Sequence, residues 1–487
     1  MQTIKSSWSV ATTARSCFDR FVQRSFCMKG CFLLVHERVM SSTREGARIW
    51  QSIKQFQYMP KEERNRSNYR CPIMRLLEDL FLVDLEFAIE KGADVLFFSV
   101  QKEWTDKLKA RSHINKADYS NALYECLGEL CELSMLVQDE YGFVLNDVPR
   151  IVSMCPRAVI PSHSRTPLSP RTKSRFVHFL CLRVGDIFRY LGDTKQAREL
   201  YTCAYRAYPD DGQSCNQIGL IESAQRRHLE ALYYHVLALN TRNSFTPAAA
   251  NIEQIYNKFA SINIEDNNTD YDLMFLKVIG RCHSLVFSES TILQRMSSVL
   301  RERTTNYSRL HMHFVIAVAV WYALGGSQDE VRCANQIITI IVDQFVLFVE
   351  QALKEGRSKE EKEELLSLLW IYASWIEAKK ISMMNRVADD ASWIRNLALL
   401  IDNAGNDLTL KCEKLHFVPL ALLDYERASM SSLISRLTVI LWRTFKSYRI
   451  SEAPSENFTE FVDAHMSAFV ERRRPRVSRT VAVLSSM

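Results

Sequence analysis

Hydrophobic side chains recur at every third or fourth position through most of this chain, the spacing that places them on one face of an α-helix. In residues 119–145, for example, Leu123, Leu127 and Leu130 follow one another along a single stripe. Gly92 supplies a stop signal after an earlier stretch of this kind. The pattern predicts three long helices in the first part of the chain, over residues 74–92, 95–114 and 119–145.

An internal repeat of 34 residues follows these helices. Gly185 and Gly219 are 34 positions apart, and the same offset relates Val184 to Ile218, Ala197 to Ala231, and Ala204 to Ala238. This period is typical of tetratricopeptide repeats, in which small residues let two antiparallel helices approach closely. Pro209 would stop the second helix of the first copy. The second copy is looser, so its assignment rests on the small residues.

Beyond about residue 260 the helical pattern continues without the repeat. The stretches there are long and apolar on one face, as in stacked helical hairpins. The clearest are residues 311–325, 329–356, 359–381 and 431–448.

We therefore predict an all-α protein in three parts. Residues 1–70 form an N-terminal extension that is partly disordered, and residues 71–257 form a helical domain built on tetratricopeptide hairpins. Residues 258–487 form a C-terminal domain of α-helical hairpins with a basic tail.

The composition agrees with this architecture. The 487 residues include 14 glycines and 12 prolines, fewer turn residues than a protein of many short strands needs. A net charge of +6 is small for this length and predicts no general attraction to polyanions. The 13 cysteines occur singly, without a CxxC pair, and we expect reduced thiols in the core. The chain has no uncharged apolar run of about 18 residues, so we expect no membrane span.

Three segments stand apart from the helical pattern. The first 40 residues contain only two acids and resemble a transit peptide, although we favour a disordered extension or an upstream start, with Met40 opening the ordered protein. Residues 157–175 hold three prolines, five basic residues and no acid, which predicts a mobile loop. Residues 472–480 carry five arginines and are expected to extend into solvent.

The sequence contains none of the common catalytic motifs. Phosphate-loop, dinucleotide, serine-hydrolase and zinc-protease signatures are missing. His311 and His313 would lie on different faces of one helix, so we expect no shared metal there. We therefore predict no catalytic residue, no metal, no cofactor and no enzyme activity, and we expect a binding protein.

The candidate binding residues lie on three predicted helices. In tetratricopeptide repeats the first helix of each pair lines a concave groove, which places Arg189 on or near the inner face and Tyr190 beside it. A guanidinium there can hold a phosphate through two hydrogen bonds. Lys102 and Lys109 are seven residues apart and share one face of their helix, while Asn216 can offer its amide to a bound peptide.

A simpler interpretation of the same residues remains open. Arg189 can pair with Asp186 three positions earlier, with Tyr190 packed as an ordinary core residue. The two lysines would then belong to a solvated helix face. This alternative predicts a scaffold whose groove binds an unphosphorylated partner.

The segment GDIFRYLGD, residues 185–193, is similar to the part of 14-3-3 proteins that presents an Arg-Tyr pair to phosphoserine. QKEWTDKLK, residues 101–109, looks like their lysine-bearing third helix. Residues 75–257 resemble more specifically the 14-3-3-like tetratricopeptide domain of the SMG adaptors of nonsense-mediated mRNA decay, which are related to the ever-shorter-telomeres protein. The chain is most similar to the type of adaptor without a PIN nuclease domain.

This resemblance implies a function and partners. Lys102 and Arg189 would form the phosphate-binding pair, with Lys109, Tyr190 and Asn216 matching 14-3-3 positions more loosely. The target would be the phosphorylated up-frameshift RNA helicase, and the adaptor would recruit decay or dephosphorylation factors. A heterodimer with a sister SMG adaptor and a cytoplasmic location, with shuttling to the nucleus, are also implied.

A second class of function stays open beside the adaptor. The basic loop at 157–175 and the arginine tail suit direct binding of nucleic acid, which would include a telomere-associated role. Such binding would weaken steeply with salt.

Overall fold

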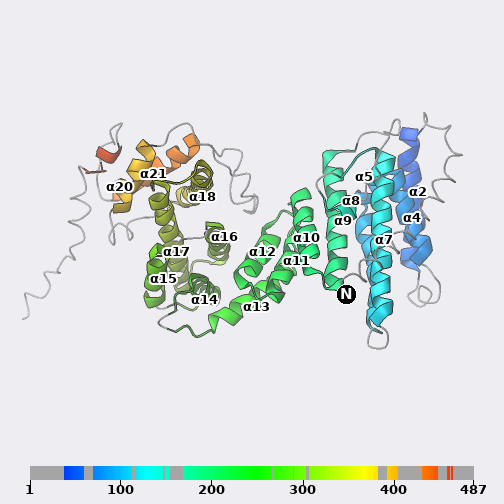
Figure 1. Cartoon of the computed structure of the whole chain (residues 1–487), viewed down its shortest axis with the longest axis horizontal. Coiled ribbons are helices and arrows are strands. Elements are labelled where there is room, and N and C mark those ends of the chain that lie inside the picture. The colour runs from blue at the N-terminus through cyan, green and yellow to red at the C-terminus, as the bar shows by residue number, and fades with distance from the viewer. Residues whose placement is uncertain are drawn as a thin grey trace, which may run out of the picture. The chain divides into compact units, whose positions relative to one another are not determined.

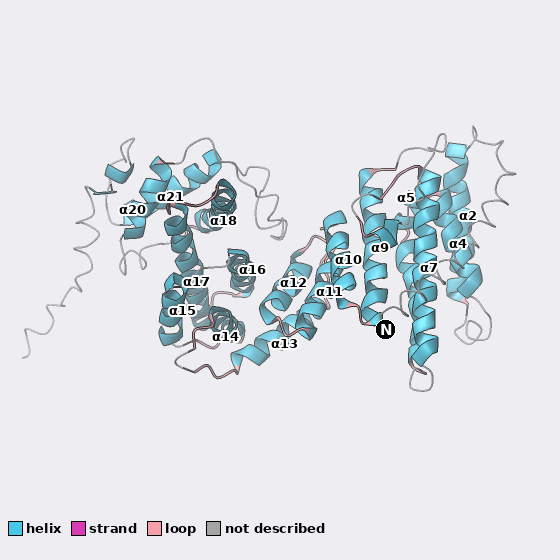
Figure 2. Ribbon diagram, in the orientation of Figure 1, coloured by secondary structure: helices cyan, strands magenta, loops and turns pink. Residues whose placement is uncertain are grey.

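Every secondary-structure element that the structure, a computed structural model, describes is a helix (Figures 1 and 2). The predicted all-α fold class is therefore confirmed for this part of the chain. Two compact units are present, Met1–Ile221 and Glu222–Met487. The described residues are 38–59, 70–111, 116–145, 148–153, 168–265, 268–288, 290–302, 307–381, 392–403, 430–447, 458–460 and 462–463.

Several predictions from the sequence concern residues outside these ranges. The transit-peptide alternative rests on residues 1–37, most of the basic loop lies in residues 154–167, and the arginine tail is residues 472–480. The predicted domain limits after residues 70 and 257 stay predictions.

The first unit is built from antiparallel helices that are close in sequence. They are α2 (Arg38–Tyr58), α4 (Arg70–Val83), α5 (Leu85–Glu90), α6 (Ala93–Lys109), α7 (Lys116–Tyr141), α8 (Arg150–Ser153), α9 (Pro170–Leu191), α10 (Thr194–Ala207) and the first part of α11 (Gln213–Ala224). Helix α2 packs against α4, with Ile53 fully buried. The predicted N-terminal extension thus contains a helix that belongs to the folded unit.

The prediction of one continuous helix over residues 74–92 is wrong, because the helix breaks at Asp84. Asp84 has a non-helical backbone, and its carboxylate accepts the Phe87 N–H at 2.9 Å, which caps α5. Tyr141 of α7 fills the break, since its hydroxyl accepts the Leu85 N–H at 2.8 Å and donates to the Phe81 carbonyl at 3.1 Å. In the sequence, Asp84 occupies a position of the apolar stripe, so the spacing did not indicate that it caps a helix.

Four phenylalanines form the aromatic centre of the first unit. Phe81 of α4, Phe97 of α6, and Phe176 and Phe179 of α9 are buried, and their neighbouring ring centroids lie 6.1 to 6.4 Å apart. Rings at this separation in tilted or edge-to-face contact add to the free energy of apolar burial. This cluster fixes α6 and α9 side by side, and these two helices carry the candidate binding residues.

Helices α9 and α10 form the first predicted tetratricopeptide hairpin, joined by a turn of two residues. Gly192 ends α9 with φ of 91°, and the Asp193 N–H donates to the Phe188 carbonyl at 2.9 Å. This is the C-terminal helix motif that favours glycine. Asp193 then caps α10 by accepting the Gln196 N–H at 3.0 Å. The sequence Leu-Gly-Asp therefore encodes the reversal.

Gly185 permits the close approach of α9 and α10. A Cβ atom at this position would lie 2.8 Å from Cε1 of Tyr201, whose side chain is fully buried. The predicted role of the small residue is thus confirmed for the first copy of the repeat. The second copy corresponds to α11 and α12 (His228–Asn240).

The second unit is likewise built from helices. They are α12, α13 (Ala248–Ala260), α14 (Tyr271–His283), α15 (Ser290–Glu302), α16 (Tyr307–Ala323), α17 (Gln328–Ala352), α18 (Lys359–Ala378), α20 (Ser392–Asp402) and α21 (Met430–Ser447). The helices predicted over 311–325, 329–356, 359–381 and 431–448 are confirmed as α16, α17, α18 and α21. Ser327 and Ser358 begin α17 and α18 with capping boxes completed by Glu330 and Glu361.

Helix α17 is the one described helix that is long and apolar enough to span a membrane by length and composition. Its most apolar stretch has a mean hydropathy of 1.5, and 67% of that stretch is buried inside the protein. Phe345, Phe348 and Ile341 are fully buried there. These features are those of a core helix.

The interior of the second unit includes two histidines of α16, of which His313 lies 2.8 Å from Asp272 Oδ1. His311 and His313 of α16 are both buried and face different neighbours, His311 the ring of Tyr233 and His313 the ring of Phe275. Their separation on the helix therefore agrees with the expectation from the sequence. Burial lowers the pKa of His311 from 6.5 to about 4.

We predict that Gly185→Ala destabilises the first unit by about 1–3 kcal/mol, because the added methyl group overlaps the ring of Tyr201. Urea unfolding followed by circular dichroism measures this change. The matched control is Gly326→Ala, where an added Cβ meets no atom within 4 Å. Equal stability of the two variants would contradict the close packing of α9 against α10.

We also predict an acid-sensitive second unit. His311 binds a proton more weakly in the folded than in the unfolded protein, so its contribution to stability is present above pH 6.5 and is lost as the pH falls towards 4. The loss amounts to about 2–3 kcal/mol over this range. Urea midpoints measured from pH 7 to pH 4 should fall less in His311→Leu than in the wild type. Parallel pH profiles would show that His311 is not buried as a neutral group.

Candidate functional site

The last turn of α9 and the second half of α6 bring four of the five candidate residues together. The Tyr190 ring lies between two cations. The Arg189 guanidinium carbon is 4.5 Å from the ring centroid, and the Lys109 ammonium is 5.9 Å from it. Cations over an aromatic face are attracted by its quadrupole, so the tyrosine holds the two positive groups near each other.

Lys102 lies on α6 with Lys109 and forms an exposed ion pair with Asp106. Its side chain is 46% exposed. The hydrogen bond that the Lys102 ammonium donates to Asp106 is the largest cause of the raised pKa of Lys102, and Tyr190 and Asp186 act in the same direction. Lys102 is therefore close enough to α9 to share the electrostatic field of the other candidates.

The Arg189 side chain is hydrogen-bonded to a residue of the protein interior. Its Nε–H donates to the hydroxyl of Tyr201 at 3.2 Å, and its side chain is only 25% exposed. Asp186 also lies near, with 3.8 Å between its Oδ1 and the Arg189 Nη2. The ion pair between Arg189 and Asp186, which the scaffold interpretation predicts, is thus present, but its atoms are too far apart for a hydrogen bond.

The main partner of Asp186 is Arg183, which the sequence analysis missed. Arg183 Nη1 donates to Asp186 Oδ2 at 3.0 Å, and the two side chains are 8% and 2% exposed. The Arg183 guanidinium also stacks on the ring of Phe98 at 3.9 Å and reaches Gln213 Oε1 at 3.4 Å. An arginine within the apolar stretch FLCLRVGDIF was the available signal, because a buried guanidinium needs an acidic partner.

Tyr119 of α7 lies within the electrostatic range of the site. Its side chain is half-buried, and burial is the main cause of its raised pKa. Tyr190 and Asp106 also raise this pKa, whereas Arg189 lowers it. A phenol from a third helix therefore borders the cations, and sequence spacing gave no sign of it.

Asn216 differs from the other candidates. It lies in α11 and is 4% exposed, so its amide is not on the surface that carries the two lysines. Its predicted contact with a bound peptide stays a prediction.

The charges of the site favour an anion. Arg183 compensates the buried carboxylate of Asp186. The remaining basic groups of the site are Arg189, Lys102 and Lys109, of which Lys102 pairs with the exposed carboxylate of Asp106. One guanidinium with several donors and two ammonium groups on flexible stems can surround a phosphate.

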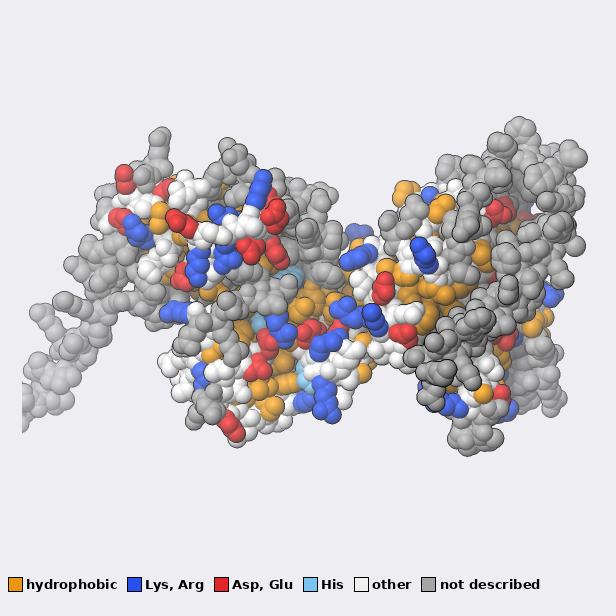
Figure 3. Space-filling view, in the orientation of Figure 1, with side chains coloured by type: hydrophobic (Ala, Val, Ile, Leu, Met, Phe, Trp, Pro, Cys, Tyr) orange, Lys and Arg blue, Asp and Glu red, His pale blue; other side chains and the backbone are white. Residues whose placement is uncertain are grey.

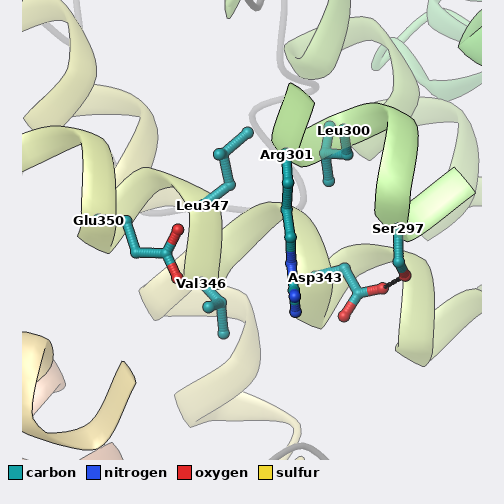
Figure 4. Close-up of a pocket in the computed structure, with 7 residues that line it drawn as sticks. All are labelled: Ser297, Leu300, Arg301, Asp343, Val346, Leu347 and Glu350. Atoms are coloured by element: carbon teal, nitrogen blue, oxygen red, sulfur yellow. Dashed lines mark hydrogen bonds between the residues drawn. The ribbon is translucent and has the colours of Figure 1, made fainter. Parts of the chain in front are cut away.

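A pocket in the second unit is a weaker candidate. Figure 4 shows it between α15 and α17, where the Ser297 hydroxyl donates to Asp343 and Arg301 and Glu350 lie at the rim. Leu300, Val346 and Leu347 complete its lining. Within the described ranges, no group of three His, Cys, Asp or Glu side chains could hold a metal ion.

Comparison with known sequences relates the chain to two groups of proteins. The profile of a family described as the Est1 DNA/RNA binding domain matches residues 197–418. The nonsense-mediated mRNA decay factor SMG7 of zebrafish (Danio rerio) is 22% identical over 259 residues, which cover 50% of this chain and 21% of SMG7. The chain thus spans about a fifth of the length of this curated relative.

Solved structures share the fold. The C. elegans SMG5–SMG7 complex includes a chain with a TM-score of 0.65 and 22% identity, covering 82% of this chain and 98% of its own. The crystal structure of Est1 and Cdc13 gives a TM-score of 0.50 at 13% identity, covering 82% of this chain and 95% of that one. Together these matches confirm the resemblance to SMG-type adaptors of nonsense-mediated mRNA decay, related to Est1.

We predict that Arg183→Met destabilises the first unit by about 3–5 kcal/mol, because it leaves the Asp186 carboxylate buried without its main partner. Thermal unfolding measures the change. The double variant Arg183→Met/Asp186→Leu removes both charges and should recover much of the loss. If the single variant is as stable as the wild type, Asp186 does not depend on Arg183.

Proposed function

We propose that this protein is a phosphoserine- and phosphothreonine-binding adaptor of nonsense-mediated mRNA decay. The observation that carries the proposal is the convergence of Arg189 and Tyr190 of α9 with Lys102 and Lys109 of α6. In this proposal the target is the phosphorylated up-frameshift RNA helicase, as the resemblance implies. The protein acts by binding and not by catalysis.

The exposed pair of Lys102 and Asp106 suits reversible phosphate binding. Ion pairs on a helix surface contribute little to stability, because solvent screens both charges. A phosphate with nearly two negative charges competes well with one carboxylate for the ammonium group. Lys102 can therefore turn from Asp106 to the ligand, while Arg189 already points into the site.

The comparisons support one of the proposed partners. The solved relative is a complex of two SMG adaptors, which supports a heterodimer of this chain with a sister adaptor. Recruitment of decay or phosphatase factors would complete the function. We place this activity in the cytoplasm, with shuttling to the nucleus.

A nucleic-acid-binding or telomere-associated scaffold is the second candidate. It is favoured by the description of the matching family as an Est1 DNA/RNA binding domain. On the face drawn in Figure 3, basic and acidic side chains are interspersed on both units. The described side chains on this face therefore form no broad surface of one sign, and we rank the candidate second.

The test is calorimetric titration with a Ser-Gln peptide from the helicase, with and without phosphate. We expect the phosphorylated peptide to bind more tightly, and Lys102→Glu/Arg189→Glu to weaken this binding roughly 100-fold, because two charge-assisted contacts are lost. Lys107→Glu is the matched control, since Lys107 lies on α6 in a similar exposed pair with Glu103. Circular dichroism checks that all variants are folded.

Equal affinity for both peptides would refute the phosphate-dependent adaptor. In that case RNA titrations at several salt concentrations test the second candidate, which requires a steep loss of affinity as salt rises.

A further inference from the structure

The phosphate site depends on how one arginine is oriented, and the structure shows what orients it. Arg189 presents two kinds of donor, the Nε–H at its side and the Nη groups at its end. The Nε–H is occupied by the hydroxyl of Tyr201 at 3.2 Å. Nη2 lies 3.8 Å from Asp186 Oδ1, beyond hydrogen-bond distance, so the Nη groups are the donors left for a ligand.

Tyr201 is itself fixed in place. Its side chain is fully buried, and its ring packs directly against Gly185, where a Cβ atom would approach to 2.8 Å. Its hydroxyl donates to Asp186 Oδ1 at 2.8 Å. Because a phenol has one hydrogen, the oxygen that donates to Asp186 can only accept from Arg189.

The chain of contacts ends at a second arginine. The other carboxylate oxygen of Asp186, Oδ2, accepts a hydrogen bond from Arg183 Nη1 at 3.0 Å. The guanidinium carbon of Arg183 lies 3.9 Å from the ring centroid of Phe98 of α6. Asp186 therefore accepts one hydrogen bond from Arg183 and one from the Tyr201 hydroxyl. Tyr201 in turn accepts a hydrogen bond from Arg189. The two carboxylate oxygens of Asp186 and the hydroxyl of Tyr201 thus each have a defined partner, which fixes the direction of the hydrogen bond between Tyr201 and Arg189.

We propose that Tyr201 is a positioning residue of the phosphate site, which holds the Arg189 guanidinium with its Nη groups towards the ligand. This inference rests on the proposed function. Tyr201 does not touch the ligand, and it acts only through Arg189. Neither its place in the aromatic slot of the repeat nor its packing against Gly185 requires the hydroxyl.

The first experiment compares Tyr201→Phe with the wild type by calorimetry of the phosphorylated and unphosphorylated peptides. The variant keeps the ring and removes the hydroxyl, so we expect about tenfold weaker binding of the phosphorylated peptide and unchanged binding of the unphosphorylated one. The control is Tyr205→Phe, which removes another buried hydroxyl from α10 one turn away. The stoichiometry shows whether each variant is fully folded.

Wild-type affinity of Tyr201→Phe for the phosphorylated peptide would overturn the proposal. An equal loss in Tyr205→Phe would also overturn it, because the effect would then be one of general packing. A loss confined to Tyr201→Phe supports it.

A second readout is independent of any peptide. Phenylglyoxal modifies accessible guanidinium groups, and peptide mass spectrometry follows its reaction at Arg189. Faster labelling in Tyr201→Phe than in the wild type supports anchoring by Tyr201, and equal rates overturn it. If the wild type does not discriminate phosphate, the proposed function fails, and the labelling still decides whether Tyr201 holds Arg189.

Discussion

The buried carboxylate of Asp186 is the constraint on which the site depends. A charge at 2% exposure must be compensated, and Arg183 and the hydroxyl of Tyr201 do so from opposite sides. Tyr201 reaches Asp186 only because Gly185 lets α10 approach α9 closely. The same hydroxyl then holds Arg189. Helix packing, charge compensation and the orientation of the proposed phosphate-binding group are therefore one arrangement.

The site combines one rigid cation with two that can move. The Arg189 guanidinium is three-quarters buried and tethered, whereas the ammonium groups of Lys102 and Lys109 are on exposed stretches of α6. In the proposed phosphate binding, the fixed guanidinium would give the direction of binding, and the flexible lysines would adjust to the ligand at the cost of some side-chain entropy. This division explains why an arginine, and not a third lysine, stands beside Tyr190.

Much of the fold follows from periodicity, while the details of the site do not. The long helices and the α9–α10 hairpin were predictable, because their apolar spacing and small residues are local signals. The break at Asp84 was not, since its side chain caps α5 from within an apolar stripe. Asp186 has an arginine three residues before it and another three after it, and only tertiary packing decides that Arg183 is the closer partner. The burial of Asn216 likewise depends on contacts that spacing does not encode.

The central claim is that Arg189 and Lys102 hold a phosphate, and a crystal structure of the protein with a bound phosphoserine peptide tests it most directly. The account predicts a phosphate within hydrogen-bond distance of the Arg189 Nη groups and of the Lys102 ammonium, with Asp106 displaced from Lys102 and Tyr201 still bonded to the Arg189 Nε. A peptide bound elsewhere, or a phosphate that touches neither residue, would contradict it.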